Sequence, residues 1–186
     1  MNILAKRIIT IILLLAITVT SSLIQSVSAA TAVEINASAD AALENFYTKV
    51  KNGEELVDSA KGVLVFPNVY KAGFVFGAEY GEGALRVKGA TVDYYSTTTG
   101  SFGWQLGAQK KSLIMLFMDD AALSKLRTSS NWKAGVDASV TVIAIGADGS
   151  IDTQKLNKPI LAFVIGQKGL MYNLTLEGTK LNKLNK

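Results

Sequence analysis

Apolar residues follow a helical period before Gly62 and a strand period after it. The helical stripe comprises Ala39, Ala42, Leu43, Phe46, Tyr47 and Val50. Their spacing of three and four residues predicts an amphipathic helix that begins at an N-cap, Ser38. Asn52-Gly53 breaks this pattern, and the residues from Glu54 to Ala60 predict a second, short helix.

The strand period predicts a series of short strands with turns between them. The strand candidates are residues 63–66, 74–80, 85–95, 102–108, 113–118, 134–142, 159–166 and 170–176. Turns are expected at Pro67-Asn68, Gly81-Glu82-Gly83, residues 97–100 and Asp148-Gly149, because these residue types favour turns.

The glycines between Gly73 and Gly83 are unusual in strand-like sequence. A glycine inside an element costs roughly 0.5–1 kcal/mol relative to alanine. Such positions therefore need a reason: a bulge, a strongly coiled sheet, or the close approach of another backbone or a ligand. A helix predicted from Asp119 to Arg127 interrupts the strands. The expected fold is a single α+β domain with a coiled or barrel-like antiparallel β-sheet, an N-terminal amphipathic helix and a short mid-chain helix.

The first residues have the organisation of a secretory signal peptide. Lys6 and Arg7 precede an apolar stretch from Ile8 to Ala16, and small residues around Ala29 and Ala30 suit cleavage, most of all after Ala29. We therefore expect export to the periplasm. The predicted layout is a signal peptide over residues 1–29, a short linker over 30–37, a domain over 38–178 and a C-terminal tail over 179–186.

The chain of 186 residues contains no histidine and no cysteine. This composition excludes zinc sites built on nitrogen and sulfur ligands, and it excludes Ser-His and Cys-His nucleophile pairs. The chain has 19 basic and 15 acidic residues, with two of the basic ones in the leader, so its charge is nearly balanced and indicates no nucleic-acid partner. We expect a protein that is not an enzyme and that has no metal site and no cofactor.

Five segments, in order along the chain, resemble the SYLF domain family. They are residues 61–74 (KGVLVFPNVYKAGF), 81–85 (GEGAL), 101–107 (SFGWQLG), 112–118 (SLIMLFM) and 169–178, which begins with GLMY and ends with LEG. The resemblance spans roughly Ser38 to Gly178. Residues 132–136 and 162–166 depart from the family pattern, and the lipid-attachment cysteine of many bacterial members is absent.

The resemblance implies a lipid-binding module. Eukaryotic members of the family bind phosphoinositides and some bind actin, whereas bacterial members are exported envelope proteins. For a periplasmic protein it therefore implies lipid or a membrane surface as the partner, and neither actin nor phosphoinositides. The alternative is a structural or protein-interaction module of the cell envelope, whose sheet contacts a protein or peptidoglycan and not lipid.

Four lysines and one tryptophan are the candidate lipid-contacting residues. Lys61 and Lys71 flank the VFP segment, and Lys49 and Lys51 lie at the end of the first predicted helix, so all four could contact anionic headgroups. The alternative is four solvated lysines, two of them favoured by the helix dipole. Trp104 could line an apolar ligand site or belong to the core.

Overall fold

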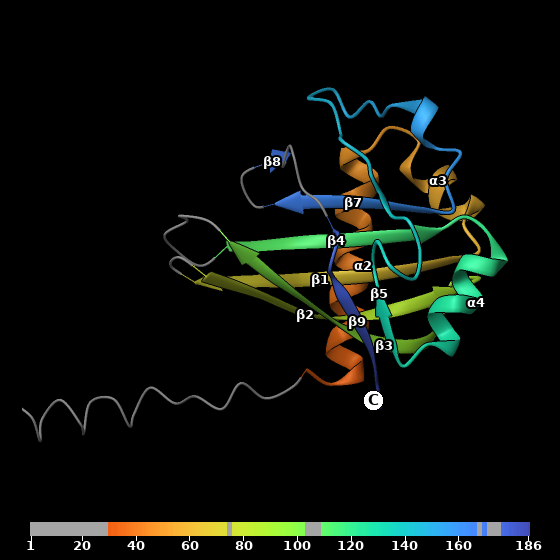
Figure 1. Ribbon diagram of the computed structural model, residues 1–186. Helices are drawn as coiled ribbons and strands as arrows, with labels where there is room; N and C mark the ends of the chain where they lie inside the picture. The colour runs from red at the N-terminus through yellow and green to blue at the C-terminus, as the bar shows by residue number, and fades with distance from the viewer. Residues whose placement is uncertain (1–29, 74–75, 103–108, 167–168, 171–175) are drawn as a thin grey trace, which may run out of the picture.

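The protein folds around one long, strongly twisted sheet (Figure 1). The computed structural model describes residues 30–73, 76–102, 109–166, 169–170 and 176–186. The predicted signal peptide and Trp104 lie outside these residues.

Within the described residues, nine strands make up the sheet. They are β1 (Gly62–Gly73), β2 (Phe76–Val87), β3 (Ala90–Phe102), β4 (Gln109–Phe117), β5 (Asn131–Lys133), β6 (Thr141–Val142), β7 (Ile160–Gly166), β8 (Gly169–Leu170) and β9 (Lys180–Leu184). Their order is β5-β9-β3-β2-β1-β4-β7-β6, with β8 beside β7, and every ladder between them is antiparallel except β6–β7. The predicted α+β fold with a coiled, antiparallel sheet is confirmed.

Helices cover both faces of the sheet. α2 (Ala32–Lys49) and α3 (Gly53–Ser59) lie on one face, which we call the α2 face. α4 (Asp120–Thr128) lies on the other, the α4 face, and a short 3₁₀ helix, η1, spans Thr153–Lys155. The second predicted helix and the mid-chain helix, which Asp119 caps, are confirmed.

Each face has its own hydrophobic core. On the α2 face, Phe46 of α2 packs with Phe163 of β7. On the α4 face, Leu126 of α4 shares a core with Trp132 of β5. The central strand β4 contributes to both cores, as the apolar run at residues 113–118 predicts.

The first helix begins at Ala32 and not at Ser38. Thr31 is its N-cap: the Thr31 hydroxyl accepts a hydrogen bond from the Glu34 N–H, and the Glu34 carboxylate accepts one from the Thr31 N–H (2.7 Å). This capping box satisfies backbone donors that the first turn leaves free. Ile35 adds a further turn to the buried stripe. Residues 32–37 are therefore helical and do not form a linker.

Two predicted turns are absent because β1 and β2 are longer than expected. β1 continues through Pro67-Asn68, and β2 continues through Gly81-Glu82-Gly83. After β2 the chain reverses at Lys88-Gly89, where both residues have positive φ. A Cβ on Gly83 would overlap with the Val65 carbonyl oxygen of β1. This glycine therefore allows two backbones to approach closely and does not form a turn.

Three further segments also differ from the prediction. Residues 97–100 belong to β3 and are not a turn. The C-terminal residues form β9 between β3 and β5, because Leu181 is buried in the core of the α4 face, and they are not a frayed tail. Most of the predicted strand over residues 134–142 is irregular. There the Asp137 carboxylate accepts a hydrogen bond from the Lys133 N–H (2.7 Å) and turns the chain.

Candidate functional site

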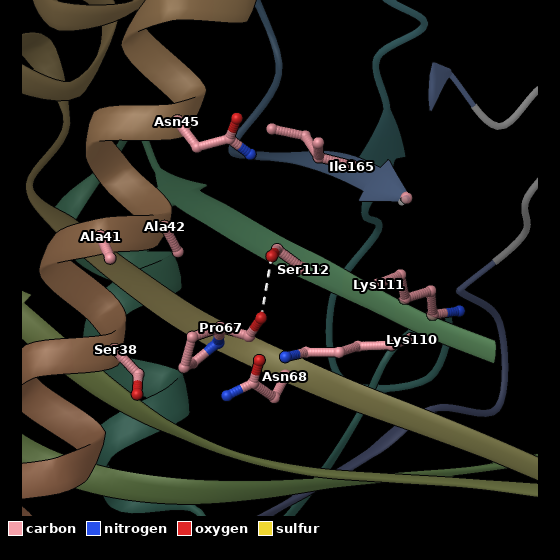
Figure 2. A pocket seen from close by; sticks show the side chains of 11 residues that line it. Ser38, Ala41, Ala42, Asn45, Pro67, Asn68, Lys110, Lys111, Ser112 and Ile165 are labelled. Carbon is pink, nitrogen blue, oxygen red and sulfur yellow. Dashed lines mark hydrogen bonds between the residues drawn. The ribbon is translucent and has the colours of Figure 1, made fainter. Parts of the chain in front are cut away.

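A groove follows the flank of α2 where this helix crosses the sheet (Figure 2). Two adjoining hollows, of about 530 and 370 Å³, form it and share Ser38, Pro67 and Asn68. The larger hollow, the tyrosine section, is further lined by Ala30, Glu34, Ile35, Tyr70, Tyr80, Gly81 and Glu82. The smaller hollow, the lysine section, is further lined by Ala41, Ala42, Asn45, Lys110, Lys111, Ser112, Ile165 and Gly166. We call the whole feature the helix–sheet groove.

The floor of the groove is a bulge in the central strand β1. Near Pro67 the ladders of β1 with both β2 and β4 shift register, because β1 has an extra residue there. Proline has no N–H to donate, and interior strands accept it at such bulges. The Ser112 hydroxyl of β4 donates a hydrogen bond to the Pro67 carbonyl (2.8 Å) and holds the bulge in place.

The bulge determines which residues of β1 face the groove. Phe66 and Val69 are three positions apart, yet both lie in the core of the α4 face. Strict alternation would place them on opposite faces, so every residue after the bulge has exchanged faces. Tyr70 therefore lines the groove, and Lys71 lies on the α4 face.

Lys110 supplies a cation to the lysine section. It is the cross-strand neighbour of Tyr70, and its Nζ lies 5.8 Å from the centre of the Tyr70 ring, within cation–π range. Its ammonium is directed over β1 towards Asn68 (Figure 2). Among the residues that the structure describes, no carboxylate pairs with Lys110, and the side-chain amides of Asn45 and Asn68 make no hydrogen bond. The lysine section thus presents polar groups whose hydrogen-bonding capacity is unused.

Two tyrosines give the tyrosine section an aromatic wall. Tyr70 and Tyr80 are directly paired across β1 and β2, and they are 54% and 47% exposed. Ile35 of α2 lines the same section and is buried. A tyrosine side chain combines an apolar ring with a polar tip, so these residues suit contact with a molecule that is partly apolar and partly hydrated.

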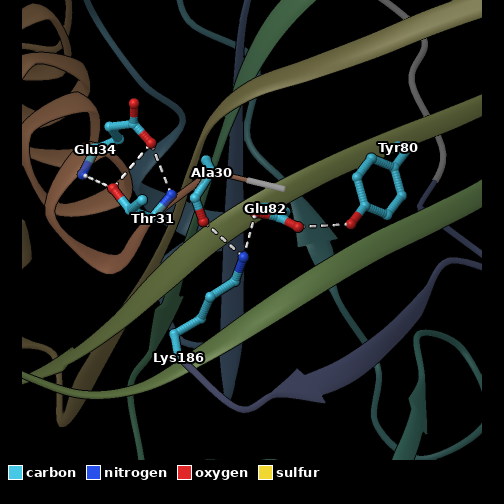
Figure 3. A network of polar contacts seen from close by, with 6 residues as sticks. All are labelled: Ala30, Thr31, Glu34, Tyr80, Glu82 and Lys186. Carbon is cyan, nitrogen blue, oxygen red and sulfur yellow. Dashed lines mark hydrogen bonds and ion pairs between the residues drawn. The ribbon is translucent and has the colours of Figure 1, made fainter. Parts of the chain in front are cut away.

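A polar network ties the C-terminus to the tyrosine section (Figure 3). Lys186 Nζ donates to the Ala30 carbonyl (2.6 Å) and pairs with Glu82 Oε2 (3.0 Å). Glu82 Oε1 accepts a hydrogen bond from the Tyr80 hydroxyl (2.8 Å). Partial burial and the interaction with Glu82 raise the pKa of Tyr80 to about 12, so the phenol remains protonated and donates to Glu82 at neutral pH.

Lys71 belongs to an ion cluster on the α4 face. Glu79 of β2 contacts Lys111 Nζ at 2.6 Å and Lys71 Nζ at 4.0 Å. The side chains of Glu79 and Lys111 are 11% and 8% exposed, so this pair is almost completely removed from water. The cluster connects β1, β2 and β4 beyond the bulge.

The four predicted lysines do not form one patch. Lys61 precedes β1 and Lys71 lies near its other end, so at about 3.3 Å per residue they are roughly 30 Å apart. Lys49, Lys51 and Lys61 are exposed, and none of them lines the groove. A contact of each lysine with lipid stays a prediction, and Trp104 lies outside the described residues.

Sequence patterns did not single out Lys110, Tyr70 or Tyr80. Only the strand register brings them together, because it places Tyr70 opposite Tyr80 on one side and Lys110 on the other. The available signal was Pro67 inside an apolar run, which indicates a bulge wherever the strand continues beyond it.

Comparison of the sequence with models of known protein families gives one match. The family model Ysc84, described as Las17-binding protein actin regulator, matches residues 98–186. This match agrees with the resemblance to the SYLF family that the sequence motifs predict. A search of curated proteins gives no significant match.

The SYLF match begins within β3 and continues to the C-terminus. It therefore includes Lys110 and Lys186, whereas α2, β1 and β2 precede it and complete the groove. None of the described helices is long and apolar enough to cross a membrane.

Proposed function

We propose that this SYLF protein is an exported envelope protein that binds lipid in the helix–sheet groove and catalyses no reaction. The observation that carries the proposal is the pairing of two exposed tyrosines with a lysine that no described carboxylate neutralises, along adjoining hollows. Hollows of this volume are in the range of small-molecule binding sites.

The two sections of the groove suit the two parts of an amphiphile, its hydrocarbon chain and its polar head. The rings of Tyr70 and Tyr80, together with Ile35, offer apolar surface to a hydrocarbon chain. Lys110 offers hydrogen-bond donors to a polar head. The lack of histidine and cysteine supports binding without catalysis, since it removes the commonest general base and nucleophile pairs.

A protein-binding module of the cell envelope is the second candidate. The observation that favours it is the family description, which refers to binding of a protein, Las17, and to regulation of actin. For this chain the equivalent would be an envelope protein that contacts the exposed tyrosines. Such a module would not bind pure lipid vesicles of any composition.

Replacing both tyrosines with serine (Tyr70→Ser/Tyr80→Ser) is expected to weaken vesicle binding by about tenfold or more. Truncation of an aromatic anchor at an interface commonly costs over 1 kcal/mol, and about 1.4 kcal/mol corresponds to a factor of ten. Co-sedimentation with vesicles of phosphatidylethanolamine, with and without phosphatidylglycerol and at two salt concentrations, measures the change.

The matched control is Val136→Ser, because Val136 is 77% exposed and lies outside the groove. This variant should bind vesicles like the wild type. If the wild type binds none of these vesicles, the protein-binding module is favoured. An equal loss in Val136→Ser would show that the groove is not the lipid site.

Export is expected to leave Ala30 as the first residue of the mature protein. The N-cap of α2 is Thr31, so cleavage before Ala30 would keep the first helix intact. N-terminal sequencing of the protein from the periplasmic fraction of a Gram-negative host checks this. Recovery of the uncleaved chain in the cytoplasmic fraction would contradict export.

A further inference from the structure

Resting on the proposed function, we propose that the helix–sheet groove selects an amphiphile whose head carries one negative charge. The head lies at Lys110, and the hydrocarbon chain follows Tyr70 and Tyr80 towards Ile35. The two ends of the groove differ in charge: one is basic and the other is acidic. This difference determines which class of ligand fits and which end of the groove holds its head.

The lysine section is suited to an anionic head. Lys110 Nζ and the side-chain amides of Asn45 and Asn68 are hydrogen-bond donors without partners among the described residues. The Tyr70 ring, whose centre lies 5.8 Å from Lys110 Nζ, carries no negative charge that would compete with an oxygen anion for the ammonium. A carboxylate or phosphate oxygen at this position would form charge-assisted hydrogen bonds, which are stronger than neutral ones.

The opposite end of the groove is acidic, and its hydrogen-bonding groups are already used. The Glu34 carboxylate accepts hydrogen bonds from the N–H and hydroxyl of Thr31 (2.7 and 2.9 Å). The Glu82 carboxylate accepts one from Tyr80 and pairs with Lys186 (Figure 3). An anionic head placed here would face two carboxylates and a cation that is already paired. A hydrocarbon chain meets no such conflict.

The charge count in the lysine section limits the head to one negative charge. Lys111 also lines this section, but its Nζ pairs with Glu79 on the α4 face, so in the described part of the groove Lys110 alone faces the head. A zwitterionic head would bring its own cation close to Lys110, and a multiply charged head would keep unneutralised charge. The heads that remain carry one negative charge and no cation. Both free fatty acids and phospholipids with a singly charged head have this property.

Calorimetric titration of the mature protein with two lysophospholipids of the same saturated chain tests the proposal. Below their micelle concentrations, lysophosphatidylglycerol is expected to bind about 10–100-fold more tightly than lysophosphatidylcholine, the contribution of one hydrogen bond to a charged group. Lys110→Met is expected to bind the two lipids within about threefold of each other, because it keeps the apolar stem and loses the charge. Lys110→Arg should retain the preference, since it keeps the charge.

Lys158→Met is the matched control, since Lys158 is an exposed lysine outside the groove, and it should keep the wild-type preference. Laurate distinguishes the two sources of an anionic head. Tighter binding of laurate than of lysophosphatidylglycerol assigns the site to free fatty acids, and the reverse assigns it to phospholipids.

Equal wild-type affinity for the two lysophospholipids would overturn the charge selectivity and leave lipid binding intact. A preference lost in Lys158→Met and kept in Lys110→Met would overturn the position of the head. If no lipid binds, the proposed function itself fails.

Discussion

Glu79→Gln is expected to lower the free energy of unfolding by about 3–5 kcal/mol. Glu79 and Lys111 are almost buried, and their charged atoms lie 2.6 Å apart. Glutamine has nearly the same shape but no charge, so the Lys111 ammonium would stay buried without its counter-ion. That ion cannot regain the hydration it has in the unfolded chain, which makes the broken pair costly. Equilibrium unfolding in urea, followed by circular dichroism, measures the loss.

Two comparison variants separate this effect from a general loss of charge. Asp152→Asn removes one partner of the exposed Asp152–Lys155 pair (3.6 Å) and is expected to cost less than about 1 kcal/mol. Glu79→Leu/Lys111→Met removes both buried charges and is expected to restore most of the stability. If Glu79→Gln cost less than about 1 kcal/mol, water would have to reach the ion pair in the folded protein.

Phe46→Ala is expected to lower the free energy of unfolding by about 3–5 kcal/mol, the usual cost of removing a buried phenylalanine. Phe46 is completely buried and meets Phe163 of β7 edge to face, with the ring centres 5.0 Å apart. A Cβ on Gly53 would lie 3.1 Å from the Phe46 ring, so α3 packs closely against the same side chain. The substitution therefore leaves a cavity where α2, α3 and the sheet meet.

The control for Phe46→Ala is Val33→Ala in the same helix, where the side chain is 77% exposed. Its effect should stay within about 0.5 kcal/mol. Thermal unfolding of both variants checks the stabilities. Because α2 forms one wall of the helix–sheet groove, Phe46→Ala should also weaken lipid binding at temperatures where the variant is still folded. Unchanged stability would show that α2 is held to the sheet by other contacts.

Local sequence patterns are sufficient for much of the fold. The apolar stripe of α2 and the cap of α4 at Asp119 depend on residues within one or two helical turns, so their periodicity is visible in the chain. The doubly buried β4 is equally plain as an apolar run. The fold class and the SYLF resemblance follow from such local features.

Residues that favour turns are ambiguous when only the sequence is considered. Pro67-Asn68 and Gly81-Glu82-Gly83 have turn-like composition, yet both lie inside long strands. Proline lacks the N–H that a strand ladder requires, and this loss is tolerated both at the end of a strand and at a bulge. A glycine likewise permits both a turn and a close backbone contact. The choice depends on the neighbouring strand: the Ser112 hydroxyl binds the Pro67 carbonyl, and the Val65 backbone leaves no room for a side chain at Gly83.

The candidate site depends on that choice. One extra residue at the Pro67 bulge reverses the faces of the rest of β1, so Tyr70 enters the groove and Lys71 joins Glu79 on the α4 face. The register with β4 then places Lys110 beside Tyr70. Composition and periodicity identify the strands and the aromatic and basic residues they carry. The pairing of strands distant in sequence assigns those residues to a face, because a shift of one residue moves every side chain to the other side of the sheet.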